Sequence, residues 1–362
     1  MATLTSRLAR IAVMLAAVIA VSVVPADPAI TQQSDAPAGC VTATTSMTMY
    51  AVELPRTPEG DVRLGYGLTP ETASIPGPTI ELIEGDCLAI TLVNLIPEET
   101  LAELRDHPLL GSRDPEMPLG VSLHVHGVRY TTESDGTIHT DSFVPPNLAR
   151  TYTWYAAPKV VAGARILSQG TAGTWWYHDH VIGTDHGTGG AGSGLFGAVI
   201  VRRATDIPAD RTYVIGMGPD ATINMRHFPD TDCPSAPALE DASNTCLVAL
   251  QGERVEFAVI GFGDDFHTFH LHGHTWADNR TGILSSQLDD TRIIDNKTVG
   301  PADTFGFQII AGESVGPGAW MLHCHVQTHS DRGMATFLHV LNPDGSPASA
   351  AGLDLHEHFG RS

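Results

Sequence analysis

The sequence is poor in basic residues. Only 20 of its 362 residues are Lys or Arg, against 41 Asp and Glu, so the formal net charge at pH 7 is −21. Nucleic acids and anionic membranes attract basic surfaces, which this chain does not provide. We therefore expect no nucleic-acid partner. Such acidity most often serves solubility, and it also suits cationic or metal-ion substrates.

Long apolar runs are also missing, with one exception near the N-terminus. Residues 11–24 carry no charge; Arg7 and Arg10 precede them, and the small residue Ala26 follows. The run is shorter than the ~20 apolar residues of a spanning helix. Residues 1–26 are therefore interpreted as a secretory signal peptide, with an uncleaved membrane anchor as the alternative. This predicts a secreted or extracytoplasmic protein, in the periplasm or outside the cell, with no stable membrane insertion.

Cysteine is scarce, with five in the chain. In an oxidising compartment, Cys40 could pair with Cys87 and tie the start of the mature fold to a strand. Cys233 could pair with Cys246 and staple a loop rich in Pro, Ser and Asp. The remaining Cys324 lies between two histidines, which suggests a ligand rather than a disulfide partner.

The remaining composition indicates a packed, strand-rich protein. A hydrophobic content of 42% with 17% charged residues excludes a disordered or fibrous chain. Short strand-like runs separated by Gly, Pro and Asp occur at residues 80–82, 87–93, 151–155, 198–201, 254–260, 305–310 and 336–340. This pattern is typical of antiparallel β-sandwiches, so the predicted fold class is all-β.

A short Pro-containing segment divides the chain into two predicted sandwiches, residues 40–203 and 208–343. Two segments look like additions to this plan. Residues 97–120 are rich in Leu, Glu and Pro and are expected to hold one short helix, and residues 229–246 are expected to form a loop. The small, polar tail, residues 344–362, is expected to be disordered.

Histidines supply the functional signal. Ten of the 18 fall into four clusters: His124 with His126, His178 with His180, His267 with His270 and His272, and His323 with His325 and His329. Side chains two apart on a strand face the same side, so each His-x-His pair can present two imidazoles to one place. Copper, zinc and iron all accept neutral imidazole, so the histidines alone do not name the metal.

A cysteine narrows the choice of metal. Two imidazoles, a thiolate and a weak axial thioether form the ligand set of blue-copper sites, and the chain offers His267, Cys324, His329 and Met334. In an extended segment Cys324 points one way while His323 and His325 point the other. One tripeptide can thus join a single copper to a copper cluster. One copper plus a three-copper cluster would store the four electrons that reduce dioxygen to water.

At this point the sequence resembles the multicopper oxidases, and more closely the two-domain small laccases of bacteria. The matching motifs extend over nearly all of the expected mature chain: Ser74-Ile75-Pro76-Gly77-Pro78, Leu123-His124-Val125-His126-Gly127, Tyr177-His178-Asp179-His180, His186-Gly187-Thr188-Gly189-Gly190, His267-Thr268-Phe269-His270, Ala277-Asp278-Asn279-Arg280-Thr281-Gly282, and His323 to His329 with Met334. The resemblance implies two cupredoxin-like Greek-key β-sandwich domains. It implies a laccase activity that couples one-electron oxidation of phenols, aromatic amines or similar small donors to four-electron reduction of O2 to water.

The resemblance also implies four copper ions per chain and assigns their ligands. The type 1 copper would take His267, Cys324, His329 and Met334. The type 2 copper would take His124 and His270. The type 3 pair would take His126, His178, His180, His272, His323 and His325.

Assembly follows from how these ligands divide along the chain. The N-terminal half holds four of the cluster histidines and the C-terminal half holds the others. A cluster therefore needs both kinds of domain face to face, and head-to-tail closure makes a ring. The resemblance implies a homotrimer with each cluster at a subunit boundary.

Some neighbouring residues have two interpretations. By resemblance, Tyr130 is an electron or radical relay and Asp135 a proton donor or an orienting group. The alternatives are a packed aromatic ring and a turn aspartate. Asp179 lies between two ligands and is expected to point away from the metals, while His186 and His274 are expected to pack or form hydrogen bonds.

Substrate preference is less specified. A thioether axial ligand such as Met334 favours easily oxidised donors, whereas Asp264 and Asp265, just before His267, depart from the resemblance and suit cationic donors or metal ions. The alternatives are an oxidase of ferrous or cuprous ions, a copper nitrite reductase and a copper carrier without activity. The reductase would carry its blue site in the first domain, and a carrier would not need four His-x-His pairs.

Overall fold

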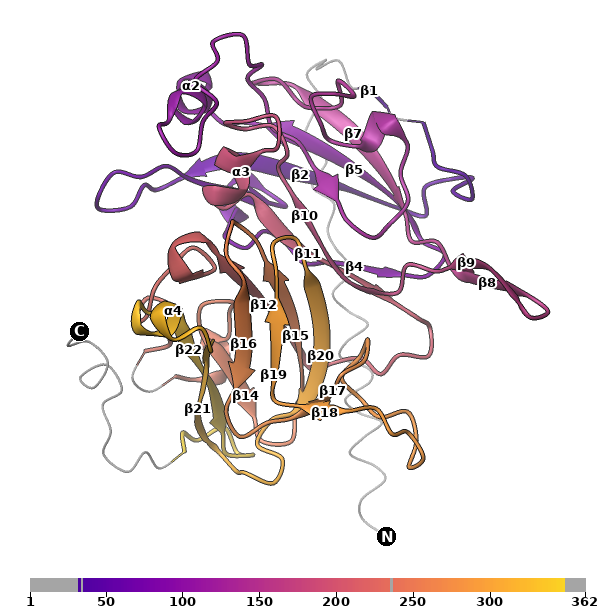
Figure 1. Ribbon diagram of the computed structural model, residues 1–362, viewed down its shortest axis with the longest axis vertical. Helices are drawn as coiled ribbons and strands as arrows, with labels where there is room; N and C mark the ends of the chain where they lie inside the picture. Colours follow the sequence, from indigo (N-terminus) through magenta and orange to yellow (C-terminus); the bar gives the residue numbers. More distant parts are fainter. Residues whose placement is uncertain (1–31, 34, 235–236, 349–362) are drawn as a thin grey trace. The chain divides into compact units, whose positions relative to one another are not determined.

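The computed structural model of the chain describes residues 32–33, 35–234 and 237–348 (Figure 1). The expected signal peptide, residues 1–26, lies outside the described residues, as does most of the expected disordered tail. The described start of that tail is a turn, in which the Asn342 side-chain amide donates to the carbonyls of Ser346 and Pro347. Within the described ranges, no helix is long and apolar enough to cross a membrane.

The first half of the described chain forms a two-sheet sandwich. One sheet has the order β1-β7-β5-β2-β3, with strands Gln32–Gln33, Ala149–Tyr155, Cys87–Asn94, Thr45–Leu54 and Arg63–Gly67. The other has the order β4-β11-β10-β6, with strands Ile80–Ile83, Phe196–Arg202, Gly173–His178 and His124–Val125. Alternate residues of the strands point inward. They bury Leu64, Ile90 and Trp154 completely in a common core.

The second half forms another sandwich. One sheet has the order β13-β12-β15-β20, with strands Thr222–Ile223, Arg211–Gly218, Arg254–Gly261 and Thr304–Ile310. The other has the order β14-β22-β21-β16-β19, with strands Leu247–Leu250, Ala335–Leu341, Gly318–Cys324, His267–Leu271 and Asn296–Val299. Phe257, Phe269 and Phe307 lie in the core between them. The predicted all-β class is confirmed, while the exact domain limits stay a prediction.

The prediction of purely antiparallel sheets was wrong. Each sandwich contains parallel pairs, β2 with β5 and β4 with β11 in the first, and β12 with β15 and β14 with β22 in the second. Parallel neighbours need long crossover connections rather than hairpins. Apolar alternation within a strand does not record that direction, so the sequence pattern could not reveal it.

Short elements decorate the sandwiches. The helices are α2 (Glu98–Asp106), α3 (Thr188–Gly192) and α4 (Gln327–Asp331), with 3-10 turns at Pro70–Thr72, Thr132–Ser134, Pro219–Ala221 and Leu239–Asp241. Two small ribbons pair β8 (Lys159–Ala162) with β9 (Arg165–Gln169) and β17 (Trp276–Ala277) with β18 (Ile293–Ile294). Helix α2 confirms the helix predicted in residues 97–120, and it buries Leu101 and Leu104.

Both predicted disulfides are present. Cys40 is bonded to Cys87 at the start of β5, and Cys233 is bonded to Cys246 in the loop before β14. Cys324 is free and buried. The two disulfides leave Cys324 as the free thiol, and this is the cysteine that was predicted from the sequence to be a ligand.

The two sandwiches meet through an apolar layer and a buried ion pair. Trp176 and Phe196 of the first pack with Ala258 and Phe262 of the second. Beside them, the Arg202 guanidinium donates two hydrogen bonds to the Glu256 carboxylate, at 3.0 and 2.5 Å. Only 8% of the Glu256 side chain is exposed, so this carboxylate depends on its partner for compensation.

Replacing Arg202 with Ala would leave the buried Glu256 carboxylate without its main counter-charge. We expect the free energy of unfolding, measured by urea denaturation, to fall by about 3–5 kcal/mol. Arg203→Ala is the control, because the Arg203 side chain is 44% exposed and lies 3.8 Å from Glu84; it should cost less than about 1 kcal/mol. Equal losses in the two variants would contradict this role for Arg202.

Candidate metal centre

Four histidines form a group on the first sandwich, named here the N-terminal histidine group: His124, His126, His178 and His180. Strands β6 and β10 pair so that His124 lies opposite His178. The Nε2 atoms of His126 and His178 are 3.3 Å apart, and the His180 ring centroid lies 4.9 Å from that of His124. The pairing of two strands thus gathers all four predicted side chains.

Backbone carbonyls orient two of these rings. His124 Nδ1 is 2.6 Å from the carbonyl oxygen of Asp135, and His178 Nδ1 is 2.8 Å from that of Asp179. A carbonyl only accepts, so each Nδ1 carries the proton and each Nε2 keeps its lone pair. Trp176 stacks on His178 with ring centroids 4.0 Å apart. The lone pairs are thereby held ready for a metal ion.

A second group on the other sandwich is built in the same way: His270, His272, His323 and His325, named here the C-terminal histidine group. Strands β16 and β21 pair so that His270 lies opposite His323. The Nε2 atoms of His272 and His323 are 3.2 Å apart, and His325 lies 5.5 Å from His270 between ring centroids. His272 and His325 are exposed, and the other two half-buried. The group therefore faces outward from the sandwich.

Backbone carbonyls also orient two rings of the C-terminal histidine group. His270 Nδ1 is 2.9 Å from the carbonyl oxygen of Asp295, and His323 Nδ1 is 2.8 Å from that of Cys324. Ser330 Oγ adds a contact of 3.1 Å to His323 Nδ1. Both sandwiches thus present imidazoles with free Nε2 lone pairs.

A third, buried group contains the thiol. The Nδ1 atoms of His267 and His329 face each other at 3.2 Å, and Cys324 Sγ is 3.7 Å from His329 Nδ1. The backbone N–H of Thr268 donates to this sulfur at 3.4 Å. Met334 is fully buried in the same core, and its carbonyl accepts the N–H of Cys324.

Strand β21 joins the second and third groups. Leu322 and Cys324 are buried inside the sandwich, whereas His323 and His325 lie on the outer side. The predicted alternation is therefore present. The shortest route between the thiol and the outward group is one residue of backbone, reinforced by the hydrogen bond from His323 to the Cys324 carbonyl.

The environment favours the neutral form of several of these imidazoles. Burial, together with neighbouring histidines, lowers the pKa of His126 and of His267 to about 4. Burial also lowers the pKa of His178, His180 and His323. A neutral imidazole is the form that ligates metals.

Tyr130 and Asp135 lie beside the N-terminal histidine group, as predicted. The Tyr130 ring centroid is 6.0 Å from that of His124, and its hydroxyl donates to the Asp135 carboxylate. Burial, with the negative Asp135 nearby, raises the pKa of Tyr130 to about 12. Asp135 Oδ1 is also 3.6 Å from His124 Nδ1, and Oδ2 accepts from Thr137 at 2.8 Å. One carboxylate thus touches both the tyrosine and the expected ligand.

Asp179 points away from the histidines, as expected, and fastens the two ligand segments together. Its buried carboxylate accepts the backbone N–H groups of Ser122, Val181 and Ile182 at 2.8, 3.1 and 2.7 Å. The Ser122 hydroxyl in turn accepts the N–H of His180 at 2.9 Å. His124 and His180 are therefore placed by the same buried carboxylate.

The neighbouring histidines have separate roles. His274 packs behind the C-terminal histidine group, where its Nδ1 donates to the His272 carbonyl and its Nε2 accepts the N–H of Gly312. The exposed His186 lies edge-on to His180, with ring centroids 5.7 Å apart. Asp232, Cys233 and His339 also lie close together. The Cys233 sulfur is committed to a disulfide and His339 pairs with Asp232 at 2.8 Å, so this last set offers no open ligand site.

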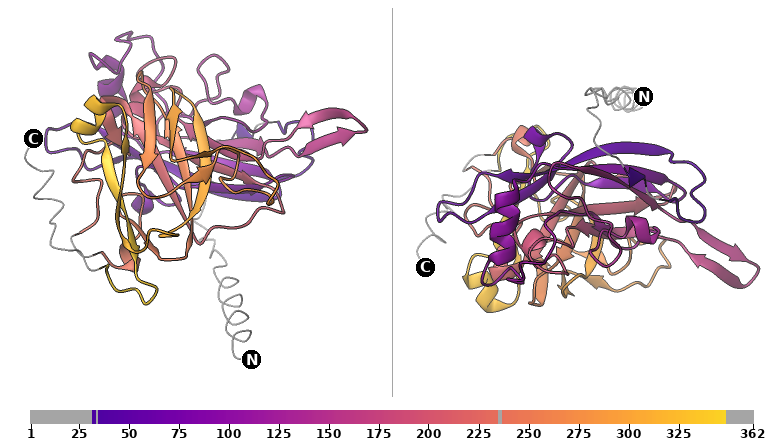
Figure 2. Two further views of the ribbon diagram at one scale, coloured as in Figure 1. Left: turned by 60° about the horizontal axis from the view of Figure 1, so that its bottom comes forward. Right: turned by 90° about the horizontal axis from the view of Figure 1, so that it is seen from above.

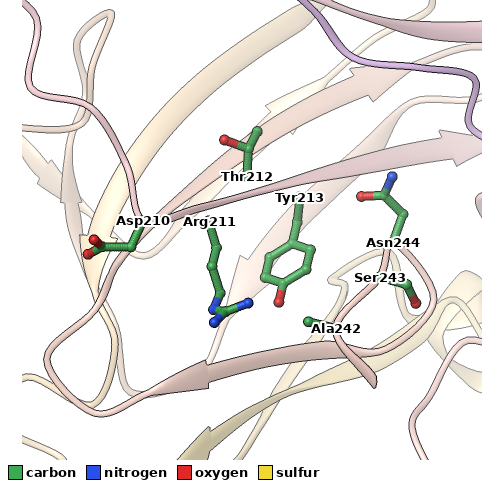
Figure 3. Close-up of a pocket in the computed structure, with 7 residues that line it drawn as sticks. All are labelled: Asp210, Arg211, Thr212, Tyr213, Ala242, Ser243 and Asn244. Atoms are coloured by element: carbon green, nitrogen blue, oxygen red, sulfur yellow. The ribbon is translucent and has the colours of Figure 1, made fainter. Parts of the chain in front are cut away.

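A surface hollow of about 260 Å³ is lined by residues 210–213 and 242–244, none of which belongs to the three groups (Figure 3). Its main polar side chains already have partners. Arg211 pairs with Glu253, the Tyr213 hydroxyl donates to the Val248 carbonyl, and the Asn244 amide oxygen accepts the N–H of Val214. The hollow is therefore not a candidate for the chemistry.

The three groups suit metal ions by their donor atoms. In each, nitrogen or sulfur atoms of three residues lie within 4.8 Å of one another. His180 Nδ1 is buried with no hydrogen-bond partner in the described part of the chain, and burying such a group is costly unless something satisfies it. Imidazole with thiolate suits copper, and imidazole alone suits copper among other metals.

Comparison with protein families identifies the metal as copper. One family model described as multicopper oxidase matches residues 115–206, and another with the same description matches residues 219–344. Together these matches cover more than half of the chain and include every histidine of the three groups.

This chain belongs to the multicopper oxidase family. Membership implies that it binds copper and acts as an oxidoreductase.

Curated relatives of this multicopper oxidase differ in activity. A probable nitrite reductase-hydroxylamine oxidoreductase fusion protein of Kuenenia stuttgartiensis is 28% identical over 280 residues, 75% of this chain and 28% of that protein. Ceruloplasmin of Mus musculus is 27% identical over 249 residues, 61% of this chain and 21% of that protein. The chain thus spans about a quarter of the length of these relatives, so their activities do not transfer directly.

Solved structures show the fold. A crystal structure of a multicopper oxidase superposes with a TM-score of 0.55 at 21% identity, covering 83% of this chain and 90% of that one. A copper nitrite reductase from Nitrosomonas europaea gives 0.53 at 18% identity, covering 84% and 98%. The fold of this multicopper oxidase is therefore shared by oxidases and reductases, and ligand number must separate them.

Several supporting groups were not found from the sequence. The carbonyls of Asp295 and Cys324, the stacking ring of Trp176 and the hydroxyls of Ser122 and Ser330 all hold ligands in place. A backbone carbonyl leaves no signal in the identity of its side chain. The only available signal was the position of Trp176, two residues before His178 on a strand and therefore on the same face.

Replacing Asp179 with Asn would turn an amide NH2 toward at least one of three backbone N–H donors. We expect the free energy of unfolding to fall by about 1–3 kcal/mol, because buried donors lose their acceptor. Asp185→Asn, on the same loop but half exposed, should change it by less than about 0.5 kcal/mol. Urea denaturation of both variants would measure the difference, and an Asp179→Asn protein as stable as wild type would refute the fastening role.

Proposed function

We propose that this multicopper oxidase is a laccase-type enzyme. It would oxidise phenols, aromatic amines or similar donors one electron at a time and reduce O2 to water in a four-electron step. The observation that carries the proposal is the alternation of side chains at the end of β21. Cys324 enters the buried His267-Cys324-His329 group, whereas His323 on β21 and His325 just after it belong to the C-terminal histidine group. Bound copper would supply the one-electron steps at the thiolate and the reduction of dioxygen at the histidines.

The chain's own residues define the electron path. His267, Cys324, His329 and the buried Met334 would hold the type 1 copper. The outer ring nitrogen of His329, Nε2, is directed toward the exposed Asp265, whose Oδ2 lies 4.0 Å away. A donor would reach this edge, and electrons would leave through Cys324 to His323 and His325. The carbonyl of Cys324 adds a hydrogen-bonded branch to His323.

A cluster of three coppers would form between copies of the chain. The ring contacts found in the described residues join histidines within each histidine group, and none of them joins one group to the other. We propose that the N-terminal group of one copy meets the outward-facing C-terminal group of the next. His124 and His270 would then hold the type 2 copper and the other six histidines the type 3 pair. Head-to-tail contacts that close give a homotrimer.

Tyr130 and Asp135 are proposed to assist at the cluster. Because burial raises the pKa of Tyr130 to about 12, the phenol keeps its proton at neutral pH and donates it to Asp135. Removal of an electron from the ring would let that proton pass to the carboxylate. The pair can therefore relay an electron together with a proton next to His124.

Export is part of the proposal. It rests on the leader-like residues 1–26 and on two disulfides, a feature of oxidising compartments. The mature enzyme would meet small donors and O2 outside the cytoplasm.

Replacing Cys324 with Ser would remove the thiolate ligand of the type 1 copper and leave the histidine ligands of the cluster unchanged. We expect copper-loaded wild-type protein to hold about four coppers per chain, the number that matches four-electron chemistry and these ligand sets. Wild type should also show an intense blue thiolate band and a near-ultraviolet shoulder. Cys324→Ser should lose the blue band and O2 consumption while keeping the shoulder, as metal analysis and absorption spectra would record.

The control is His186→Ala, which alters an exposed histidine outside the proposed ligand set and should keep the copper content and the blue band. A fully loaded wild-type protein with only one or two coppers per chain would refute the oxidase proposal. It would favour a nitrite reductase, for which reduction of nitrite is the direct assay, or a carrier.

Oxidation of ferrous ions is the second candidate function. It is favoured by the carboxylate of Asp265 close to His329 and by the exposed Asp264 beside it. The negative charge of Asp265 beside His329 attracts a divalent cation. It adds no comparable attraction for a neutral phenol.

Replacing Asp265 with Asn would distinguish the two donors. Two unit charges about 4 Å apart interact by about 1 kcal/mol in bulk water, and ferrous ion carries two charges. We therefore expect kcat/KM for ferrous ion to fall by at least about fivefold if iron is the donor. The value for a neutral phenol should change less than about twofold. Glu59→Gln, an exposed acid in the turn after β2, is the control. Equal effects on the two donors would exclude a cation site at Asp265.

A further inference from the structure

The β8–β9 ribbon is a projection of the first sandwich. Residues 158–170 leave the sandwich after β7 and return to β10, and Figures 1 and 2 show the ribbon extending beyond the strands from which it departs. Its base is fixed, because Arg129 donates to Ser168 at 2.8 Å and the Thr171 N–H donates to the Ala157 carbonyl at 2.9 Å. The ribbon is therefore held at its root and free along its length.

Both faces of this ribbon are apolar and exposed. Val161 and Ile166 lie opposite each other in the register and are 55% and 50% exposed. Val160 and Leu167 are 42% and 59% exposed. A two-stranded ribbon is marginally stable in water without a surface to pack on. Four large apolar side chains on one such ribbon therefore mark a docking element.

The ribbon also differs in charge from the rest of the protein. It carries Lys159 and Arg165 and no acidic residue, in a chain with 41 acidic and 20 basic residues. An acidic surface with apolar side chains would complement it. A second copy of this chain offers such a surface.

That surface is formed by residues 283–293, the later part of the connection from β17 to β18 together with the first residue of β18. It exposes Leu284, Leu288 and Ile293 by 42%, 94% and 49%. It carries Asp289 and Asp290 next to Leu288 and one basic residue, Arg292, so acidic residues outnumber basic ones in it. The Asp289 carboxylate accepts the N–H and O–H groups of Ser285 and of Thr291. These four hydrogen bonds hold the loop in one form with Leu288 outward, so the surface is ordered before a partner arrives.

We propose that the β8–β9 ribbon of one copy docks on residues 283–293 of the next copy in the ring. The inference rests on the proposed function, because a cluster divided between copies brings the first sandwich of one chain against the second sandwich of another. It adds the contact that holds them: apolar packing of Val161, Ile166 and Leu288, with Arg165 facing Asp290.

The positions along the chain agree with this contact. The ribbon enters β10 at Gly173, five residues before His178, which is roughly 17 Å at 3.4 Å per residue. Residues 283–293 end two residues before Asp295, whose carbonyl orients His270. Each docking element is thus connected by a short stretch of chain to the histidine group that its copy would contribute.

A charge exchange tests the pairing in copper-loaded, full-length protein. Arg165→Glu and Asp290→Arg should each weaken assembly by about tenfold or more in sedimentation experiments, and the double variant should return to within about threefold of wild type. The blue band serves as the folding control, because the proposed type 1 ligands all come from one copy. Val41→Glu, at a side chain that is 94% exposed outside the ribbon, should assemble like wild type.

A cross-link tests the same contact without relying on charge. Ile166→Cys combined with Leu288→Cys should give disulfide-linked dimers and trimers on a non-reducing denaturing gel, whereas Val41→Cys combined with Leu288→Cys should not. Assembled wild type with charge variants that assemble equally well and with no cross-link would overturn the ribbon contact alone. A monomeric wild type with full copper content and the near-ultraviolet shoulder would overturn the shared cluster as well.

Discussion

The register of two strand pairs is the constraint on which the metal centres depend. In the first sandwich His178 lies opposite His124, and in the second His323 lies opposite His270. A slip of one residue in either pairing would turn the histidines of that strand into the apolar core and bring core side chains to the surface. Burial of Val125 between His124 and His126, and of Leu271 between His270 and His272, therefore fixes the ligand geometry. The free energy that stabilises the sandwich thus also orders the site.

A histidine followed by a buried residue occurs in both sandwiches, and the type of the buried residue differs between them. Asp179 and Cys324 both follow a histidine whose Nδ1 donates to their carbonyl at 2.8 Å. In the first sandwich the inward side chain is a carboxylate that binds backbone N–H groups. In the second it is a thiol between His267 and His329. The same position thus serves the fold in the first half, and in the proposed function it serves electron transfer in the second.

Sequence reasoning reached the strands and the His-x-His pairs because these depend on local spacing. His124 and His126 share a face for any strand, and the position of Cys324 between two histidines marked it as a ligand. The two disulfides were possibilities suggested by an oxidising compartment, and the full ligand sets came from the family resemblance. Sequence reasoning could not reach the parallel pairing of β2 with β5, which depends on a long crossover, or the carbonyl of Asp295, which any residue would supply. The outward orientation of His272 and His325 also required the sheets, because alternation alone does not say which face of a strand is buried.

In the proposed function, one chain provides the whole type 1 copper site, whereas the copper cluster needs histidines from two chains. His267, Cys324, His329 and Met334 lie within one core, so their arrangement is complete as soon as the second sandwich folds. Each of the two histidine groups holds two imidazoles that backbone carbonyls orient. Four imidazoles already stand on each sandwich, so bringing the groups together requires little rearrangement of either. In the proposed assembly, the free-energy cost of forming the shared cluster then falls mainly on association. The strength of the contacts between copies would therefore govern cluster formation.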